Sequence, residues 1–208
     1  LPSEVKVKVV EAIEGIDGGP GILELSHRSA SFDRVIDGAR EVIRRLYRLP
    51  ETHEVLFLQG GASLQFAMIA LNLGTRGGFL TTGEWSRRAL AEARKVAEDK
   101  ADKPVELYSC EPLFTDVPTQ LRPQDRDGQA LDYIHLTSNN TIYGTQYKAL
   151  PQRADGKESL PPFIVDASSD IFSREIDWSK VDLLYAGAQK NAGPSGVTIV
   201  IGRRELLR

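Results

Sequence analysis

Seven short apolar runs, each the length of a β-strand, constrain the fold of this chain more than any other feature. Stretches long enough for a helix separate the first three runs, which predicts parallel strands joined by helical crossovers. Only residues 186–196 separate the last two runs, and a parallel crossover needs about a dozen residues or more, so the final strand should run antiparallel. The sequence therefore predicts an α/β fold with a mixed, mostly parallel seven-stranded sheet. We place its strands at residues 54–58, 77–81, 104–108, 132–137, 163–166, 182–185 and 197–201.

Four other segments have the spacing of apolar residues that predicts helices. Gly15 closes the first helix, and Ser31 is placed to cap the second. Turn-forming residues are frequent in residues 111–128, which predicts an irregular segment or one with a single short helix, and residues 148–162 are polar and contain proline, which predicts a loop. The expected helices cover residues 2–14, 32–48, 64–73 and 85–98.

One long reactive side chain, Lys190, lies in the small-residue loop between the last two strands, AGAQKNAGPSG. A lysine among small residues at the carboxyl end of a buried strand can lose hydration, lower its pKa and attack a carbonyl group. Taken alone, such a loop is also typical of a surface turn with a solvated lysine. The neighbouring strands decide between these two interpretations.

A carboxylate, Asp166, ends the preceding apolar strand, FIVD. A strand-end carboxylate one strand before a strand-end lysine is the pair that pyridoxal phosphate chemistry requires. The lysine bonds covalently to the cofactor, and the carboxylate keeps the pyridine nitrogen protonated. A strand-end aspartate alone is weak support, because unrelated α/β proteins also have one.

Six segments in order then resemble the phosphoserine aminotransferases, a family with the aspartate-aminotransferase-like fold of vitamin B6 enzymes. They are ELSHRSASF, FLQGGASLQFAMIALNL, TGEWSRRA, HLTSNNTIYGTQY, VDASSDIFSREIDW and YAGAQKNAGPSGVTIVIGRREL. The resemblance implies that residues 1–208 form the three-layer, pyridoxal-phosphate-binding large domain. It also implies that this chain is a fragment without the family's short N-terminal segment and small C-terminal domain.

The resemblance assigns a role to each matched position. Lys190 and Asp166 would be catalytic. His27 and Arg28 would bind the acidic groups of the substrate, although an adjacent histidine and arginine could equally be ordinary surface residues. Besides Lys190 and Asp166, the cofactor contacts would be Ala62, Ser63, Trp85, Thr141 and Gln189.

The implied reaction is pyridoxal 5'-phosphate-dependent transamination of 3-phosphohydroxypyruvate with glutamate, which gives phosphoserine and 2-oxoglutarate in serine biosynthesis. The family works as a homodimer, and it can also act on a phosphorylated threonine derivative in pyridoxine synthesis. Two alternatives stay open. Another B6 aminotransferase or lyase would share Lys190 and Asp166 without needing His27 and Arg28, and an inactive dimerising fragment would bind no cofactor.

Composition points to a small-molecule partner. The net charge of −3 leaves no basic surface for nucleic acid or an anionic membrane, and no apolar run approaches the ~20 residues that span a bilayer. The single cysteine, Cys110, cannot form an internal disulfide, which favours a reducing cytoplasm. Three scattered histidines and this cysteine have no metal-ligand spacing, so no metal is expected.

Overall fold

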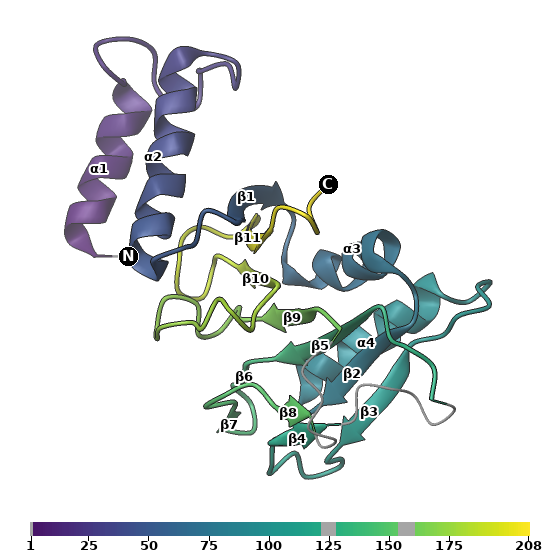
Figure 1. Cartoon of the computed structure of the whole chain (residues 1–208). Helices are drawn as coiled ribbons and strands as arrows, with labels where there is room; N and C mark the ends of the chain where they lie inside the picture. The colour runs from purple at the N-terminus through teal and green to yellow at the C-terminus, as the bar shows by residue number, and fades with distance from the viewer. Residues whose placement is uncertain (1, 122–127, 154–160) are drawn as a thin grey trace. The chain divides into compact units, whose positions relative to one another are not determined.

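The computed structural model describes residues 2–121, 128–153 and 161–208, and the chain divides into two compact units. The first unit, Leu1–Arg48, holds two helices, α1 (Ser3–Glu14) and α2 (Ala30–Tyr47) (Figure 1). Both helices were predicted, but the predicted cap of α2 is wrong. The helix begins two residues earlier than expected, so the Oγ of Ser29 accepts the cap hydrogen bond from the backbone N–H of Phe32 at 3.2 Å, while Ser31 is already helical.

The second unit, Leu49–Arg208, is built on the predicted seven-stranded sheet. The strand order is β1-β11-β10-β9-β5-β2-β3. β11 pairs antiparallel with both β1 and β10, and the other four pairings are parallel, so the mixed sheet and its antiparallel last strand are confirmed. The strands are β1 (His53–Gln59), β2 (Gly77–Thr81), β3 (Val105–Ser109), β5 (Tyr133–Thr137), β9 (Phe163–Asp166), β10 (Leu183–Gly187) and β11 (Val197–Arg203).

Two short strand pairs lie outside the main sheet. β4 (Gln120–Leu121) pairs with β8 (Gln152–Arg153), and β6 (Asn139–Asn140) pairs with β7 (Thr145–Gln146). β4 and β8 fall in the two segments predicted to be irregular, because two-residue strands carry no periodic signal. Parts of those segments, residues 122–127 and 154–160, lie outside the described residues.

Helices α3 (Ala62–Leu73) and α4 (Glu84–Val96) pack on one face of the sheet and form its main core (Figure 1). Every residue of β5, β9 and β10 is buried, which explains why these central strands read as nearly continuous apolar runs. Within the described ranges, no helix is long and apolar enough to cross a membrane.

The carboxyl ends of the central strands meet at one edge of the sheet. Asp166, the last residue of β9, pairs with Thr137 of β5 on one side and with Tyr185 of β10 on the other. Side chains of laterally paired residues point to the same face of a sheet. The fold therefore places these three polar side chains in a row.

Close packing explains a glycine inside β2. Gly77 pairs with Tyr133 of β5, and a Cβ atom at Gly77 would lie 2.4 Å from Cζ of that tyrosine ring. The ring fills the space that a side chain would need. A glycine weakens a strand in general, but here it allows a large buried aromatic residue on the neighbouring strand.

We expect Gly77→Ala to destabilise the protein by about 1–3 kcal/mol, because the Tyr133 ring must shift in a closely packed core. Gly38→Ala is the matched control. Gly38 lies inside α2 with nothing near its Cβ position, so the same change there should stabilise the helix by about 0.5–1 kcal/mol. Urea unfolding followed by circular dichroism measures both, and equal effects at the two sites would contradict the packing described.

Candidate active site

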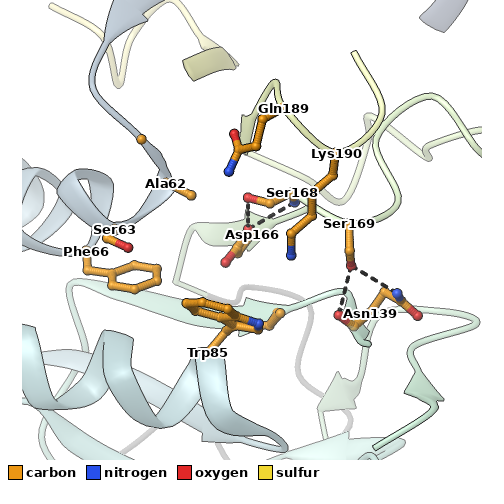
Figure 2. Close-up of a pocket in the computed structure, with 12 residues that line it drawn as sticks. Ala62, Ser63, Phe66, Trp85, Asn139, Asp166, Ser168, Ser169, Gln189 and Lys190 are labelled. Carbon is orange, nitrogen blue, oxygen red and sulfur yellow. Dashed lines mark hydrogen bonds between the residues drawn. The ribbon is translucent and has the colours of Figure 1, made fainter. Parts of the chain in front are cut away.

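A pocket opens at the edge of the sheet where the central strands end. Six of the predicted site residues line it, namely Ala62, Ser63, Trp85, Asp166, Gln189 and Lys190. They come from the start of α3, the start of α4, the end of β9 and the loop that follows β10. Residues more than a hundred positions apart in the sequence thus surround one cavity (Figure 2).

Asp166 supplies a buried carboxylate to this pocket. Its side chain is only 3% exposed, and Oδ1 accepts hydrogen bonds from the backbone N–H of Ser168 at 3.0 Å and from its hydroxyl at 2.6 Å. Burial raises the pKa of Asp166 above its ordinary value, while the two Ser168 hydrogen bonds and the charge of Lys190 oppose that rise. A cationic group bound against this carboxylate would offset the free-energy cost of burying its negative charge.

Lys190 extends into the pocket toward the indole ring of Trp85 (Figure 2). Its Nζ lies 5.2 Å from the ring centroid, a cation–π distance. The lysine is exposed, in contrast to the desolvated amine expected from its small neighbours, because those neighbours leave it open to solvent. The structure therefore presents a primary amine, a carboxylate and an aromatic face to the same cavity.

The N-terminus of α3 offers anion-binding groups. Gly61 is the N-cap residue of α3. Because glycine has no side chain, it makes no cap hydrogen bond to the backbone N–H groups of the first turn, where Ala62 and Ser63 lie. Uncapped N–H groups and the positive end of the helix dipole favour a phosphate. Glycine at the cap also keeps side-chain atoms away from the approach to this turn.

Hydrogen bonds fix the loop that carries Asp166. The hydroxyl of Ser168 accepts from the backbone N–H of Gly187 at 3.1 Å, which ties the loop to the end of β10. Ser138 donates from its backbone N–H to the carbonyl oxygen of Asp166 at 2.9 Å. These contacts hold the strand ends together from both sides of β9.

A second aspartate, Asp170, supports the same loop without lining the pocket. It is 6% exposed, and it accepts hydrogen bonds from the hydroxyl of Ser138 and, at 3.2 Å, from the amide of Gln146. Arg174 forms an ion pair with it at 3.3 Å. Asp170 is thus a paired carboxylate, whereas Asp166 faces the cavity.

Three predicted site residues do not line this pocket. Thr141 follows β6 and is exposed. His27 and Arg28 belong to the first unit, in the connection between α1 and α2, and both are exposed there. Their roles stay predictions.

Sequence reasoning missed six further lining residues, namely Gly61, Phe66, Thr137, Asn139, Ser168 and Ser169. Thr137 had a detectable signal, because it ends a predicted strand beside the strand of Asp166. Phe66 had none, since it reads as an ordinary apolar residue of α3 until the helix is placed against the sheet. Among the described residues, no group of histidine, cysteine and acidic side chains could hold a metal ion.

Comparison with known proteins agrees with this geometry. The model of the class-V aminotransferase family matches residues 2–208. The chain belongs to the class-V aminotransferase family. The resemblance stated from the sequence is therefore confirmed at the level of the family, as is the fold expected from it.

Several relatives of this class-V chain are phosphoserine aminotransferases. A phosphoserine aminotransferase of Bacillus thuringiensis subsp. konkukian is 44% identical over 215 residues, which span 100% of this chain and 56% of that protein. The structure of the phosphoserine aminotransferase from Bacillus circulans subsp. alkalophilus superposes with a TM-score of 0.86 at 40% identity, over 99% of this chain and 55% of the other.

A more distant structure, of a phosphoserine aminotransferase from Trichomonas vaginalis with bound PLP, gives a TM-score of 0.83 at 30% identity, over 100% of this chain and 56% of the other. This chain thus spans a little over half the length of the relatives that it matches.

The raised pKa of Asp166 predicts an unusual stability effect for Asp166→Asn in the cofactor-free chain. An acid whose pKa is raised by folding contributes stability below its unfolded pKa and loses it as the pH rises through the folded value. A neutral asparagine keeps the Ser168 hydrogen bonds without that loss. We expect the variant to be more stable than the parent at pH 7, with the difference vanishing below pH ~4, where aspartate is protonated in the unfolded chain as well.

Asp170→Asn is the matched control four residues away. It weakens the ion pair with Arg174 and a buried hydrogen-bond network, so it should destabilise the chain at pH 7 by about 1–3 kcal/mol. Urea unfolding across the pH range measures both variants. Destabilisation by Asp166→Asn at neutral pH would show that the Asp166 charge is better compensated than its surroundings indicate.

Proposed function

We propose that these residues form the pyridoxal 5'-phosphate site of a phosphoserine aminotransferase, which transfers the amino group of glutamate to 3-phosphohydroxypyruvate to give phosphoserine and 2-oxoglutarate. The observation that carries the proposal is the buried Asp166 beside the Lys190 amine and the Trp85 face, in a chain 44% identical to phosphoserine aminotransferases. The reaction would serve serine biosynthesis, and a phosphorylated threonine derivative is a second candidate substrate.

The pocket fits this cofactor on grounds independent of the relatives. Thr137 lines the pocket, and its buried hydroxyl has no hydrogen-bond partner within the described part of the chain. A buried hydroxyl without a partner costs free energy unless a ligand satisfies it. The phenolic and pyridine groups of pyridoxal phosphate are polar, planar and small enough to meet both this hydroxyl and the Trp85 ring.

Each pocket residue has a distinct role in this proposal. Asp166 would hold the ring nitrogen in its protonated form, because a cation satisfies a buried carboxylate. Trp85 would cover the ring face. Ala62 and Ser63, at the start of α3, would hold the phosphate with Gln189, and Thr141 would complete the polar contacts.

Lys190 would both attach the cofactor and move a proton. When bound, pyridoxal phosphate supplies an aldehyde that takes up amino groups and a ring that accepts an electron pair. Once the substrate amine had replaced it, the Nζ of Lys190 would be free to accept a proton from the substrate carbon next to the amino group and to return it to the carbon on the other side of the transferred nitrogen. The exposure of Lys190 is compatible with this role, since the substrate must reach it from solvent.

His27 and Arg28 would recognise the acidic groups of the substrate. A guanidinium binds a carboxylate or phosphate through two parallel hydrogen bonds, and an adjacent histidine adds a donor. In a homodimer the pair could serve the partner's site as well as its own. We also place the enzyme in the cytoplasm, where the free thiol of Cys110 would stay reduced.

The experiment that tests this function compares amino donors. With pyridoxal phosphate and 2-oxoglutarate present, we expect phosphoserine to yield glutamate at least about tenfold faster than serine, because two or three charge-assisted hydrogen bonds to the phosphate stabilise its bound form. Glutamate formation is followed by a coupled dehydrogenase assay. Lys190→Ala should abolish it, and Lys180→Ala, which removes an exposed lysine paired with Asp177, should leave it unchanged.

Equal or faster reaction of serine or alanine would instead indicate another B6 transaminase or lyase. Activity that survives in Lys190→Ala would show that the assigned lysine is wrong.

A further inference from the structure

Two buried polar side chains lie on the strands that flank the strand of Asp166, and neither lines the pocket. His135 of β5 and Tyr185 of β10 are 1% and 0% exposed, and Nε2 of the histidine is 2.8 Å from the tyrosine hydroxyl. Phe66 and Phe79 pack against them, with ring centroids 5.2 Å to 6.3 Å from the His135 and Tyr185 rings. Polar groups in such an aromatic environment cost free energy unless they are paired, so their hydrogen-bond pattern is informative.

The histidine is neutral, and this fixes the direction of its hydrogen bond. Burial lowers the pKa of His135 to about 3, so the imidazole carries a single N–H at physiological pH. Nδ1 has no partner among the described residues, whereas Nε2 contacts Tyr185. An unpaired N–H costs more than an unpaired lone pair, so we assign the hydrogen to Nε2, which donates to the tyrosine oxygen.

Tyr185 then has its own hydrogen available, and the strand register places this residue beside Asp166. The two residues are paired neighbours on β10 and β9, and their side chains share a face of the sheet. Burial first, and then the charge of Asp166, raise the pKa of Tyr185 well above its ordinary value. Tyr185 therefore stays protonated and acts as a donor.

Other groups also face Asp166. Ser168 donates two hydrogen bonds to Oδ1 and Lys190 contributes a positive charge, while the negative charge of Asp170 acts in the opposite direction. Ser168 and Lys190 lie in loops that follow their strands. Tyr185 and His135 differ from them because they are held inside the sheet and its aromatic packing.

We propose that Tyr185, oriented by His135, is a positioning residue that donates its hydroxyl hydrogen to Asp166 and keeps this carboxylate ionised and fixed in place. The role rests on the proposed function, because an ionised Asp166 is the group that would hold the cationic ring nitrogen of the cofactor. Three adjacent strands, β5, β9 and β10, would then act as one relay of donors, from His135 through Tyr185 to Asp166.

The test measures Asp166 itself, in the chain without cofactor or substrate. Carboxyl-¹³C aspartate labelling gives a titration curve by NMR, and the signal of Asp166 is identified by its loss in Asp166→Asn. We expect Tyr185→Phe to raise the titration midpoint of Asp166 by about one pH unit or more, which is a roughly tenfold higher proton affinity.

Tyr133→Phe is the matched control. Tyr133 is an equally buried tyrosine of the same core, but its hydroxyl has no hydrogen-bond partner in the described residues, so its loss should leave the Asp166 midpoint unchanged. A midpoint in Tyr185→Phe equal to that of the parent chain would overturn the proposal. So would an equal rise in both variants, because the effect would then come from repacking.

A double variant separates hydrogen-bond donation from Tyr185 to Asp166 from a purely structural role of the tyrosine. Tyr185→Phe leaves the His135 N–H without an acceptor and should lower stability. Adding His135→Leu removes that N–H, so urea unfolding should show stability recovering while the Asp166 midpoint stays raised. If the midpoint recovered together with stability, the relay would be wrong. The absence of cofactor keeps this outcome separate from success or failure of the proposed aminotransferase reaction.

Discussion

A carboxylate buried where parallel strands end is the constraint around which the second unit is arranged. Burying an ionised group is costly unless hydrogen bonds and opposite charge surround it. Asp166 receives two hydrogen bonds from Ser168, while its own backbone carbonyl is held by Ser138. The loops after β5 and β9 are therefore organised by contacts to one residue. The same contacts set the position of the pocket wall.

The pocket also shows how stability and function oppose one another in this fold. The surroundings of Asp166 leave its pKa raised, so part of the free energy of folding is lost at neutral pH when nothing binds. A ligand that brings a positive charge to the carboxylate binds only the folded state. Its binding therefore restores the stability that the buried charge costs at neutral pH. Asp170, paired with Arg174, shows the alternative arrangement, in which the chain satisfies its own carboxylate and no binding site results.

Much of this arrangement could be predicted from the sequence, because it depends on local patterns. Continuous apolar runs revealed the buried strands, the short gap of residues 186–196 revealed the antiparallel end of the sheet, and strand-end placement identified Asp166 and Lys190. Other features depend on distances between segments that no local pattern contains. The pairing of His135 with Tyr185 spans fifty positions and needs the strand order β5-β9-β10, and the contribution of Phe66 needs the packing of α3.

Covalent mapping of the cofactor site tests the role of Lys190 and its pocket most directly. The purified chain is incubated with one equivalent of pyridoxal phosphate, its visible absorption band is recorded, and borohydride reduction is followed by peptide mapping. We expect a single reduced adduct at Lys190, absent from Lys190→Ala and retained in Lys180→Ala. Adducts spread over surface lysines, or an adduct that persists at full yield in Lys190→Ala, would contradict the proposal that this pocket binds pyridoxal phosphate through Lys190.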